Sequence, residues 1–317
     1  MRAATIRDGE VIVAEHPDPE PAGGEILVAV RAAGLNGADL LQRRGDYPAP
    51  PGSPADIPGL ELAGVVAARG SSARRFEEGQ RVMAIVGGGG QAELCVVHER
   101  GAMPVPEGLD WAALGGIPEV FTTAHDALFT QAALAAGERL LVHGAAGGVG
   151  TAAVQLGRAV GARVTATVRN ERLRSEVERL GATAIAPEGF ERHGPFDVIL
   201  ELVGAPNLSG DLEALATGGR IAVIGVGAGA KAELDLMALM RKRGRIHGST
   251  LRARPLEEKA AAMRRIERHV LPLLESGAVR VPVTATFSLA RVGEAYERFE
   301  AGGKVGKVVL EIDATAG

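Results

Sequence analysis

A glycine-rich turn between a short apolar run and a helical pattern constrains this chain most. The run Arg139–His143 (RLLVH) leads into GAAGGVG at Gly144–Gly150, and apolar residues at helical spacing follow. Strand, glycine turn and helix in this order are typical of dinucleotide-binding folds, in which the helix N-terminus holds a pyrophosphate. Ala145 stands at the first glycine position of that pattern, so a glycine-rich turn without a ligand is the alternative interpretation.

Two glycines of this turn have distinct predicted roles. The missing Cβ of Gly147 allows a pyrophosphate to approach the backbone, and the missing Cβ of Gly150 allows the helix to pack closely on the strand. We therefore expect the turn to bind the cofactor. The predicted contacts are Ala146, Gly147, Gly148, Val149 and Gly150.

The next apolar run indicates which dinucleotide is bound. It ends at Arg169, in the region where NAD-binding proteins carry an acidic residue for the ribose 2′-hydroxyl, and Arg172 follows one helical turn later. Guanidinium groups there can form charge-assisted hydrogen bonds with a 2′-phosphate, which predicts NADPH. The alternatives are that Glu171 serves NAD, or that both arginines are simply solvated.

The two halves of the chain differ in rhythm. The first hundred residues contain short β-segments separated by Pro and Gly clusters, whereas strands and helices alternate after Pro118. Alternation of this kind predicts parallel strands with crossover helices. The predicted fold class is α/β, with a doubly wound parallel (Rossmann) sheet domain and an irregular, mainly β domain. An amphipathic helix over 256–274 and a last strand over 307–312 are also expected.

Composition excludes several classes of protein. The 317 residues suffice for about two domains, and 46% of them are hydrophobic, as in globular proteins. A net charge of -4 gives no reason to expect nucleic acid or an anionic membrane as partner. No apolar window is long enough to span a membrane, and the first residues lack a signal-peptide pattern, so a cytoplasmic protein is expected. The single cysteine, Cys95, excludes an intrachain disulfide and a multi-thiolate metal site.

Several further motifs resemble those of the medium-chain dehydrogenases/reductases, and within them the zeta-crystallin-type quinone oxidoreductases. The match covers nearly the whole chain and is most similar to the tumour-suppressor-inducible quinone oxidoreductase branch. The segments that carry it, besides the glycine turn, are Gly34–Leu40 (GLNGADL), Ala38–Tyr47 (ADLLQRRGDY), Gly59–Gly64 (GLELAG), Gly87–Ala92 (GGGGQA), Ile117–Ala124 (IPEVFTTA), Ser249–Arg254 (STLRAR) and Gly303–Val309 (GKVGKVV).

The resemblance implies a domain layout, an assembly and the absence of zinc. It implies a GroES-like catalytic domain at 1–118, completed by 252–317, an NADPH-binding Rossmann domain at 119–251, and a homodimer. Zinc alcohol dehydrogenases of this superfamily carry a cysteine ligand at the position of Asn36 and a histidine ligand at that of Leu60. Neither residue is a good zinc ligand, so we expect no catalytic metal.

The resemblance also suggests catalytic and binding residues. Asn36 and Tyr47 are expected as hydrogen-bond donors to the developing oxyanion, although turn chemistry at Asn36 and a loop anchor at Tyr47 are the alternatives. Thr123, Leu251 and Lys304 are expected near the cofactor. Thr123 has an ordinary helix hydroxyl as its alternative. Arg252 is expected to face the acceptor, with a solvated arginine as the alternative.

These features together predict an NADPH-dependent, zinc-free oxidoreductase whose partner is a small quinone or conjugated carbonyl, ortho-quinones being favoured. A conjugated acceptor takes hydride without a strong Lewis acid, because the charge spreads to oxygen and the protein mainly orients the reactants. One alternative is an NADPH-dependent enone or enoyl-thioester reductase. The other is a low-turnover NADPH-binding protein with a structural or redox-sensing role.

Overall fold

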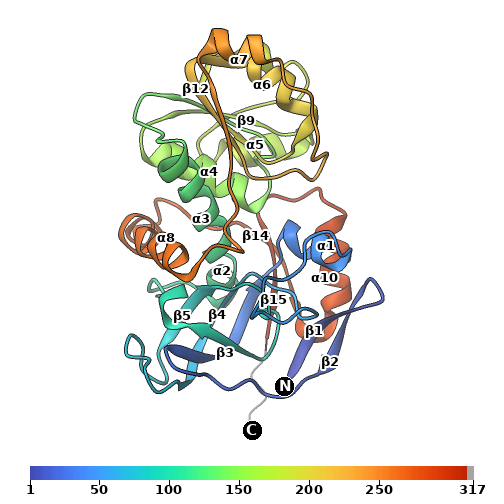
Figure 1. Ribbon diagram of the computed structural model, residues 1–317, viewed down its shortest axis with the longest axis vertical. Coiled ribbons are helices and arrows are strands. Elements are labelled where there is room, and N and C mark those ends of the chain that lie inside the picture. The colour runs from blue at the N-terminus through green and yellow to red at the C-terminus, as the bar shows by residue number, and fades with distance from the viewer. Residues whose placement is uncertain (313–317) are drawn as a thin grey trace. The chain divides into compact units, whose positions relative to one another are not determined.

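The computed structural model describes residues 1–312, which form two compact units with separate sheets (Figure 1). The first unit comprises Met1–Thr122, Leu251–Gly302 and the chain from Lys307 onward, and the second comprises Thr123–Thr250 and Gly303–Gly306. The sequence placed the boundaries at 118/119 and 251/252. Residues 313–317 of the expected closing segment lie outside the described residues.

The first unit is built on a seven-stranded sheet in the order β14-β15-β3-β4-β5-β7, with β6 also paired to β3. Its strands are β3 (Glu25–Gly34), β4 (Glu61–Arg69), β5 (Arg81–Ile85), β6 (Leu94–His98), β7 (Ala102–Pro104), β14 (Val283–Ser288) and β15 (Lys307–Glu311). Its helices are α1 (Gly37–Arg43), α2 (Trp111–Gly115), α8 (Leu256–His269), α9 (Leu271–Glu275) and α10 (Val292–Glu300), and α3 (Pro118–His125) crosses into the second unit.

Strand β3 pairs with three other strands of this sheet, namely β4, β6 and β15. Its residues alternate between the core and the other face. Ile26, Val28 and Val30 are completely buried in the core of the unit, as period-two alternation requires. The strand extends to Gly34, because its last residues pair with β15 from the far end of the chain (Figure 1). That pairing brings Gly34 opposite Val309.

An N-terminal hairpin, β1 (Arg2–Arg7) and β2 (Glu10–Glu15), was not predicted. Its turn is formed by Asp8 and Gly9, which both have positive φ, at 52° and 80°. An Asp-Gly pair with positive φ at both positions is the preferred two-residue hairpin turn. The signal was therefore present in the sequence as a dipeptide between two apolar runs.

The single helix predicted over 256–274 is wrong. The structure has two helices there, because α8 ends at His269 and α9 begins at Leu271, with Val270 at φ −110° between them. Pro272 lies in the first turn of α9 and has no N–H to continue the hydrogen-bond ladder of α8. A proline at this position ends one helix and starts the next.

The second unit is a six-stranded parallel sheet in the order β10-β9-β8-β11-β12-β13. Its strands are β8 (Arg139–Val142), β9 (Arg163–Thr167), β10 (Thr183–Ile185), β11 (Phe196–Glu201), β12 (Leu215–Val223) and β13 (Arg245–Gly248). Its helices are α4 (Gly148–Ala159), α5 (Arg174–Glu178), α6 (Leu208–Ala214) and α7 (Leu236–Lys242). The prediction of a doubly wound parallel sheet is confirmed.

The strand order of the second unit reverses between β8 and β11, which are neighbours in the sheet. Both strands are covered on two faces, since Leu140, Leu141, Val198 and Ile199 are completely buried. In sheets of this kind, ligands bind outside the carboxyl ends of the strands at the point of reversal. A ligand site is therefore expected at the residues that follow β8, β9 and β11.

Candidate active site

The glycine turn after β8 presents an open helix N-terminus. Gly147 is the N-cap of α4, has extended backbone (φ −74°, ψ 169°), is exposed and makes no side-chain capping bond. Gly148 and Val149, which begin the helix, are half-buried. The first amides of a helix have no intrahelical acceptor and carry the positive end of the dipole, so this end can hold an anion.

The two glycines that the sequence singled out differ in what surrounds them. A Cβ at Gly150 would come within 2.6 Å of the Ala145 Cα and the Gly144 carbonyl oxygen, so the fold itself requires glycine there. A Cβ at Gly147 would approach only the Gly144 oxygen, at 3.5 Å, which is ordinary contact. The fold therefore leaves free space at Gly147, as binding of a phosphate against the backbone requires.

A short segment from the C-terminal part of the chain joins the turn. The Gly306 amide donates to the Ala146 carbonyl oxygen at 2.8 Å, and Gly147 and Gly306 form an isolated parallel bridge. Lys304 belongs to the same segment and is half-buried. The predicted contacts Ala146 and Lys304 thus lie on two chain segments of the same unit.

The end of β9 carries the two predicted arginines. Arg169 and Arg172 are exposed, and neither guanidinium has a partner within residues 1–312. The Asn170 side chain accepts from the Arg172 amide at 3.1 Å and so caps the turn that presents both arginines. Glu171, the alternative residue for NAD, is exposed and lies 3.6 Å from the half-buried Arg174 as an ion pair.

In the first unit, Asn36 lies in a buried polar cluster with Lys307 and Glu61. The Lys307 ammonium donates to the Asn36 Oδ1 at 2.8 Å and lies 2.6 Å from the Glu61 Oε1. The Asn36 Nδ2 donates to the Glu61 Oε1 at 2.9 Å and to the Gly34 oxygen at 3.3 Å. Lys307 is 1% exposed and Glu61 is fully buried. The Asn36 amide is thus already held by protein groups.

Gly34 makes room for this cluster. A Cβ at Gly34 would come within 2.5 Å of the Glu61 Oε1 and 2.9 Å of the Lys307 Cε. The Glu61 Oε2 accepts from the Glu119 amide at 2.8 Å, which ties the cluster to the start of α3. Lys307 was not singled out from the sequence. Its signal is a lysine within the otherwise apolar strand KVVLE.

Asp39 fixes the start of α1 beside Asn36. Its carboxylate accepts from the amides of Asn36, at 2.8 Å, and Gly59, at 3.2 Å, and from the Gln91 side chain at 3.2 Å. Burial raises the pKa of Asp39 to about 6 against the lowering effect of these amides and of Lys307. Asp39 therefore acts as a helix cap, and Glu61 is an ion-pair partner of Lys307.

Arg252 fastens the loop that carries Tyr47. Its guanidinium donates to the backbone carbonyl oxygens of Gly87, at 2.7 Å, and Tyr47, at 2.9 Å, and to the Gln42 Oε1 at 2.5 Å. Its Cζ lies 5.1 Å from the centre of the Tyr47 ring. Arg252 is only 4% exposed. The alternative of a solvated arginine is therefore wrong, and these contacts give Arg252 a role in holding Tyr47.

Tyr47 is half-buried and carries a phenol that stays protonated at neutral pH. Burial raises the pKa of Tyr47 above its ordinary value, while the Arg252 charge opposes that shift. A protonated phenol donates one hydrogen bond. Of the remaining predicted residues, Leu251 is buried beside Arg252 and Thr123 is half-buried on α3.

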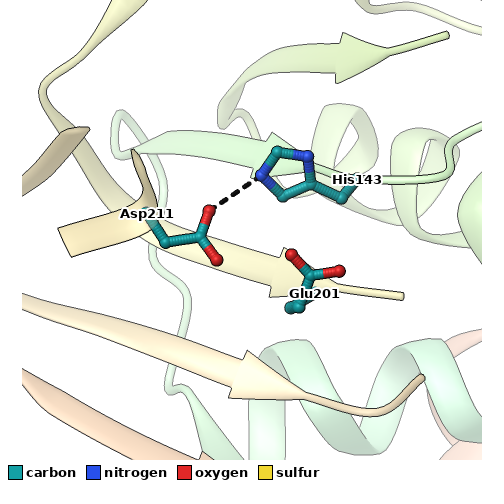
Figure 2. Close-up of side chains that lie close together, drawn as sticks. All are labelled: His143, Glu201 and Asp211. Carbon is teal, nitrogen blue, oxygen red and sulfur yellow. Dashed lines mark hydrogen bonds and ion pairs between the residues drawn. The ribbon is translucent and has the colours of Figure 1, made fainter. Parts of the chain in front are cut away.

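A buried group of titratable side chains in the second unit was not predicted from the sequence. His143, Glu201 and Asp211 lie together at the carboxyl ends of β8 and β11 and on α6, and their ligating atoms are within 4.8 Å of one another (Figure 2). No other group of three or more His, Cys, Asp or Glu residues in the described chain could hold a metal ion. His143 is completely buried, and both of its ring nitrogens lie within hydrogen-bond distance of a side chain.

Comparison with known proteins shows to which family a chain of this architecture belongs. The family description "Alcohol dehydrogenase GroES-like domain" matches residues 22–107, and "Zinc-binding dehydrogenase" matches residues 180–310. The chain is 32% identical to the quinone oxidoreductase of Homo sapiens over 307 residues, which is 92% of this chain and 90% of that protein. The chain belongs to the quinone oxidoreductase family. It is an oxidoreductase of the medium-chain dehydrogenase/reductase superfamily, with a GroES-like and a Rossmann domain.

Two further relatives bear on its chemistry. The quinone oxidoreductase from Thermus thermophilus, solved alone and in complex with NADPH, is 34% identical with a TM-score of 0.85, covering 98% of this chain and 100% of that one. A pikromycin polyketide synthase component of Streptomyces venezuelae is 34% identical over 314 residues, which is 94% of this chain and 8% of the synthase. The described chain has no helix that is long and apolar enough to cross a membrane.

Proposed function

We propose that this member of the family is an NADPH-dependent, zinc-free reductase of quinones, with ortho-quinones as favoured acceptors. The proposal depends on one combination of features. An open helix N-terminus at Gly147 is followed, after the next strand, by the exposed guanidinium groups of Arg169 and Arg172, which have no partner in the described part of the chain. The first suits a pyrophosphate and the second a 2′-phosphate. The Thermus relative, solved with NADPH, supports the same cofactor.

The choice between NADPH and NADH can be tested directly. The ratio of kcat/KM with NADPH to that with NADH should exceed tenfold, and Arg169→Gln with Arg172→Gln should bring it close to one. The matched control is Arg163→Gln, at an exposed position at the start of β9. A preference for NADH in the unmodified protein contradicts the proposed cofactor.

The chain's own groups suit an acceptor that needs no metal. Bound NADPH supplies the hydride. The quinone gains that hydride and one proton to become a hydroquinone, and negative charge develops on its oxygen before protonation. We assign to the Tyr47 phenol the role of donating a hydrogen bond to this oxygen, and to Asn36 a second donor role after its amide turns from Glu61.

The residues at the positions of the zinc ligands do not fit a metal. Leu60 has only hydrocarbon, and the Asn36 Oδ1 already accepts from the Lys307 ammonium, whose positive charge repels a cation. Activity should therefore persist after dialysis against a strong chelator, and metal analysis should find less than one tenth of a zinc ion per chain. Zinc at one per chain, with activity lost on its removal, contradicts this part of the proposal.

The roles of Tyr47 and Asn36 are tested by NADPH consumption with phenanthrenequinone. Tyr47→Phe and Asn36→Ala should each lower kcat at least tenfold with little effect on NADPH affinity, because they remove hydrogen bonds that strengthen as charge develops. Phe129→Leu, a half-buried position outside the proposed site, serves as control. Unchanged rates in both variants remove the proposed donors.

A second function, reduction of enones or enoyl thioesters, is favoured by one observation. Nearly the whole chain aligns with a segment of a polyketide synthase, a class of enzyme that acts on acyl chains. A panel of small quinones against crotonyl thioesters separates the two, and a higher kcat/KM with the thioester selects the second function. Tight NADPH binding without turnover of either class indicates a structural or redox-sensing role instead.

We also propose that the protein is a cytoplasmic homodimer joined through the nucleotide-binding domains. The dimer is proposed because members of the family often form dimers. Light scattering of the purified protein tests the dimer, and cell fractionation tests the cytoplasmic location. A monomer at micromolar concentration contradicts the dimer.

A further inference from the structure

The polar group of His143, Asp211 and Glu201 joins three strand ends in the second unit. His143 directly follows β8 and its Nδ1 lies 3.0 Å from the Oγ1 of Thr167, the last residue of β9. The His143 Nε2 lies 2.9 Å from the Asp211 Oδ1, and Glu201 is the last residue of β11. The group therefore links the ends of β8, β9 and β11 at the point where the strand order reverses.

Each strand end in this network leads into a loop at the proposed cofactor edge. His143 leads into the glycine turn, and Thr167 leads to Arg169 through one residue. The Glu201 Oε1 accepts from the amides of Val203 and Gly204, the latter at 2.8 Å, and its Oε2 accepts from the Asn207 side chain at 2.9 Å. The carboxylate thus shapes the loop after β11.

The hydrogen bonds of this network balance only if it holds an additional proton. His143, Asp211 and Glu201 are almost completely buried, so two carboxylate charges side by side are costly. Glu201 is satisfied by three N–H donors, whereas the Asp211 Oδ2 has no donor in the described chain. Figure 2 shows this oxygen on the side of the Glu201 carboxyl, which itself offers only acceptors.

A proton on the Asp211 Oδ2 satisfies every group. It donates to Glu201, the His143 Nε2–H donates to the Asp211 Oδ1, and the His143 Nδ1 accepts from the Thr167 hydroxyl. Burial, with Glu201 adding to it, raises the pKa of Asp211 against the lowering effect of His143. These two residues are the titratable groups that act on Asp211 within residues 1–312.

We propose that Asp211 is a neutral acid hydrogen-bonded to Glu201, and that the His143–Asp211–Glu201 network is a positioning device for the loops that bind NADPH. This inference rests on the proposed function, because its readout is the affinity for that cofactor. A divalent metal in place of the proton is less suitable, since both nitrogens of His143 and both oxygens of Glu201 already have partners.

Two substitutions of Asp211 distinguish a neutral carboxylic acid at this position from a charged carboxylate. In Asp211→Asn, the amide can donate to Glu201 and accept from His143 as a protonated acid does, so NADPH Kd should stay within threefold. Asp211→Leu removes both hydrogen bonds and should raise the Kd of NADPH at least tenfold, with a smaller change in kcat at saturating NADPH. Val198→Ala, buried in β11 away from the network, controls for general loss of stability.

The protonation state has a readout that does not involve the cofactor. Infrared difference spectra at pH 5, which lies between the ordinary pKa of an aspartate and the value of about 6 for buried Asp211, should contain the carbonyl band of a protonated carboxylic acid that Asp211→Asn abolishes. Metal analysis should find no stoichiometric divalent ion.

Several results overturn the inference. In binding experiments, these are equal weakening of NADPH binding by Asp211→Asn and Asp211→Leu, weakening by Val198→Ala as large as that by Asp211→Leu, or no weakening by Asp211→Leu. In the other measurements, they are the absence of the infrared acid band, or a bound metal that Asp211→Asn releases. Failure of the unmodified protein to bind NADPH at all is a different outcome. It contradicts the proposed function, and the infrared and metal measurements then still test the neutral acid.

Discussion

Lys307 carries an ammonium group into the interior of the first unit, where it contacts Glu61, Asn36 and the Leu35 oxygen. Lys307→Met leaves the Glu61 carboxylate buried without its cation, and breaking a buried pair in this way costs about 3–5 kcal/mol. We expect a loss of that size in the free energy of unfolding, measured with urea. Adding Glu61→Gln should recover part of it, and Lys231→Met, at an exposed position, should change it little. Equal stability of Lys307→Met and the unmodified protein contradicts the buried ion pair.

Asp39 makes stability depend on pH in a direction opposite to that of an ordinary ion-paired carboxylate. Its folded-state pKa of about 6 lies above the unfolded value of about 3.9, so folding favours the protonated form. Its contribution is complete below about pH 4 and is lost as pH rises through 6, up to about 3 kcal/mol. Asp39→Asn stays neutral, so its stability relative to the unmodified protein should rise by about that amount from pH 4 to pH 7. A difference that stays constant with pH indicates an unshifted carboxyl.

At the scale of elements, the two glycines at the start of α4 have different roles: Gly150 is required for packing of the fold, and Gly147 for binding of the ligand. Gly150→Ala places a Cβ 2.6 Å from the Ala145 Cα, so we expect lower stability, by about 1–3 kcal/mol, from overpacking. Gly147→Ala meets only ordinary contact, so stability should hold while NADPH binding weakens at least tenfold. Thermal unfolding and cofactor titration of both variants measure this. Undiminished NADPH affinity in Gly147→Ala shows that no phosphate lies against this turn.

Elements with strong local signals could be predicted, and those fixed by distant contacts could not. The apolar runs of β8 and β11 and the glycines before α4 identified the Rossmann sheet, because their pattern is local. The end of β3 depends on pairing with β15, and the partners of Asn36 come from Lys307 in that same strand. Nothing near Asn36 in the sequence indicates that a lysine over 270 residues later holds its amide.

The same reasoning explains why the buried network of the second unit was missed. His143, Glu201 and Asp211 come from two strand ends and a helix, and each is unremarkable in its own segment. Only the strand order, with β8 next to β11, brings the first two together. Sequence patterns therefore predict the backbone loops that hold a cofactor better than they predict the side chains that support those loops.

At the scale of the whole molecule, the proposed phosphate contacts all belong to the second unit, and the proposed donors to the acceptor belong to the first. A cofactor that binds only the folded second unit stabilises it by about 2.7 kcal/mol at one hundred times its Kd. We expect NADPH to raise the calorimetric unfolding midpoint by several degrees. NADH at the same concentration should raise it less, because it lacks the 2′-phosphate that Arg169 and Arg172 are proposed to bind. In the Arg169→Gln, Arg172→Gln double variant the two shifts should become equal. Equal midpoint shifts by NADPH and NADH in the unmodified protein mean instead that these guanidinium groups do not bind the 2′-phosphate. The reason is that any difference in affinity for the folded protein appears as a difference in the unfolding midpoint.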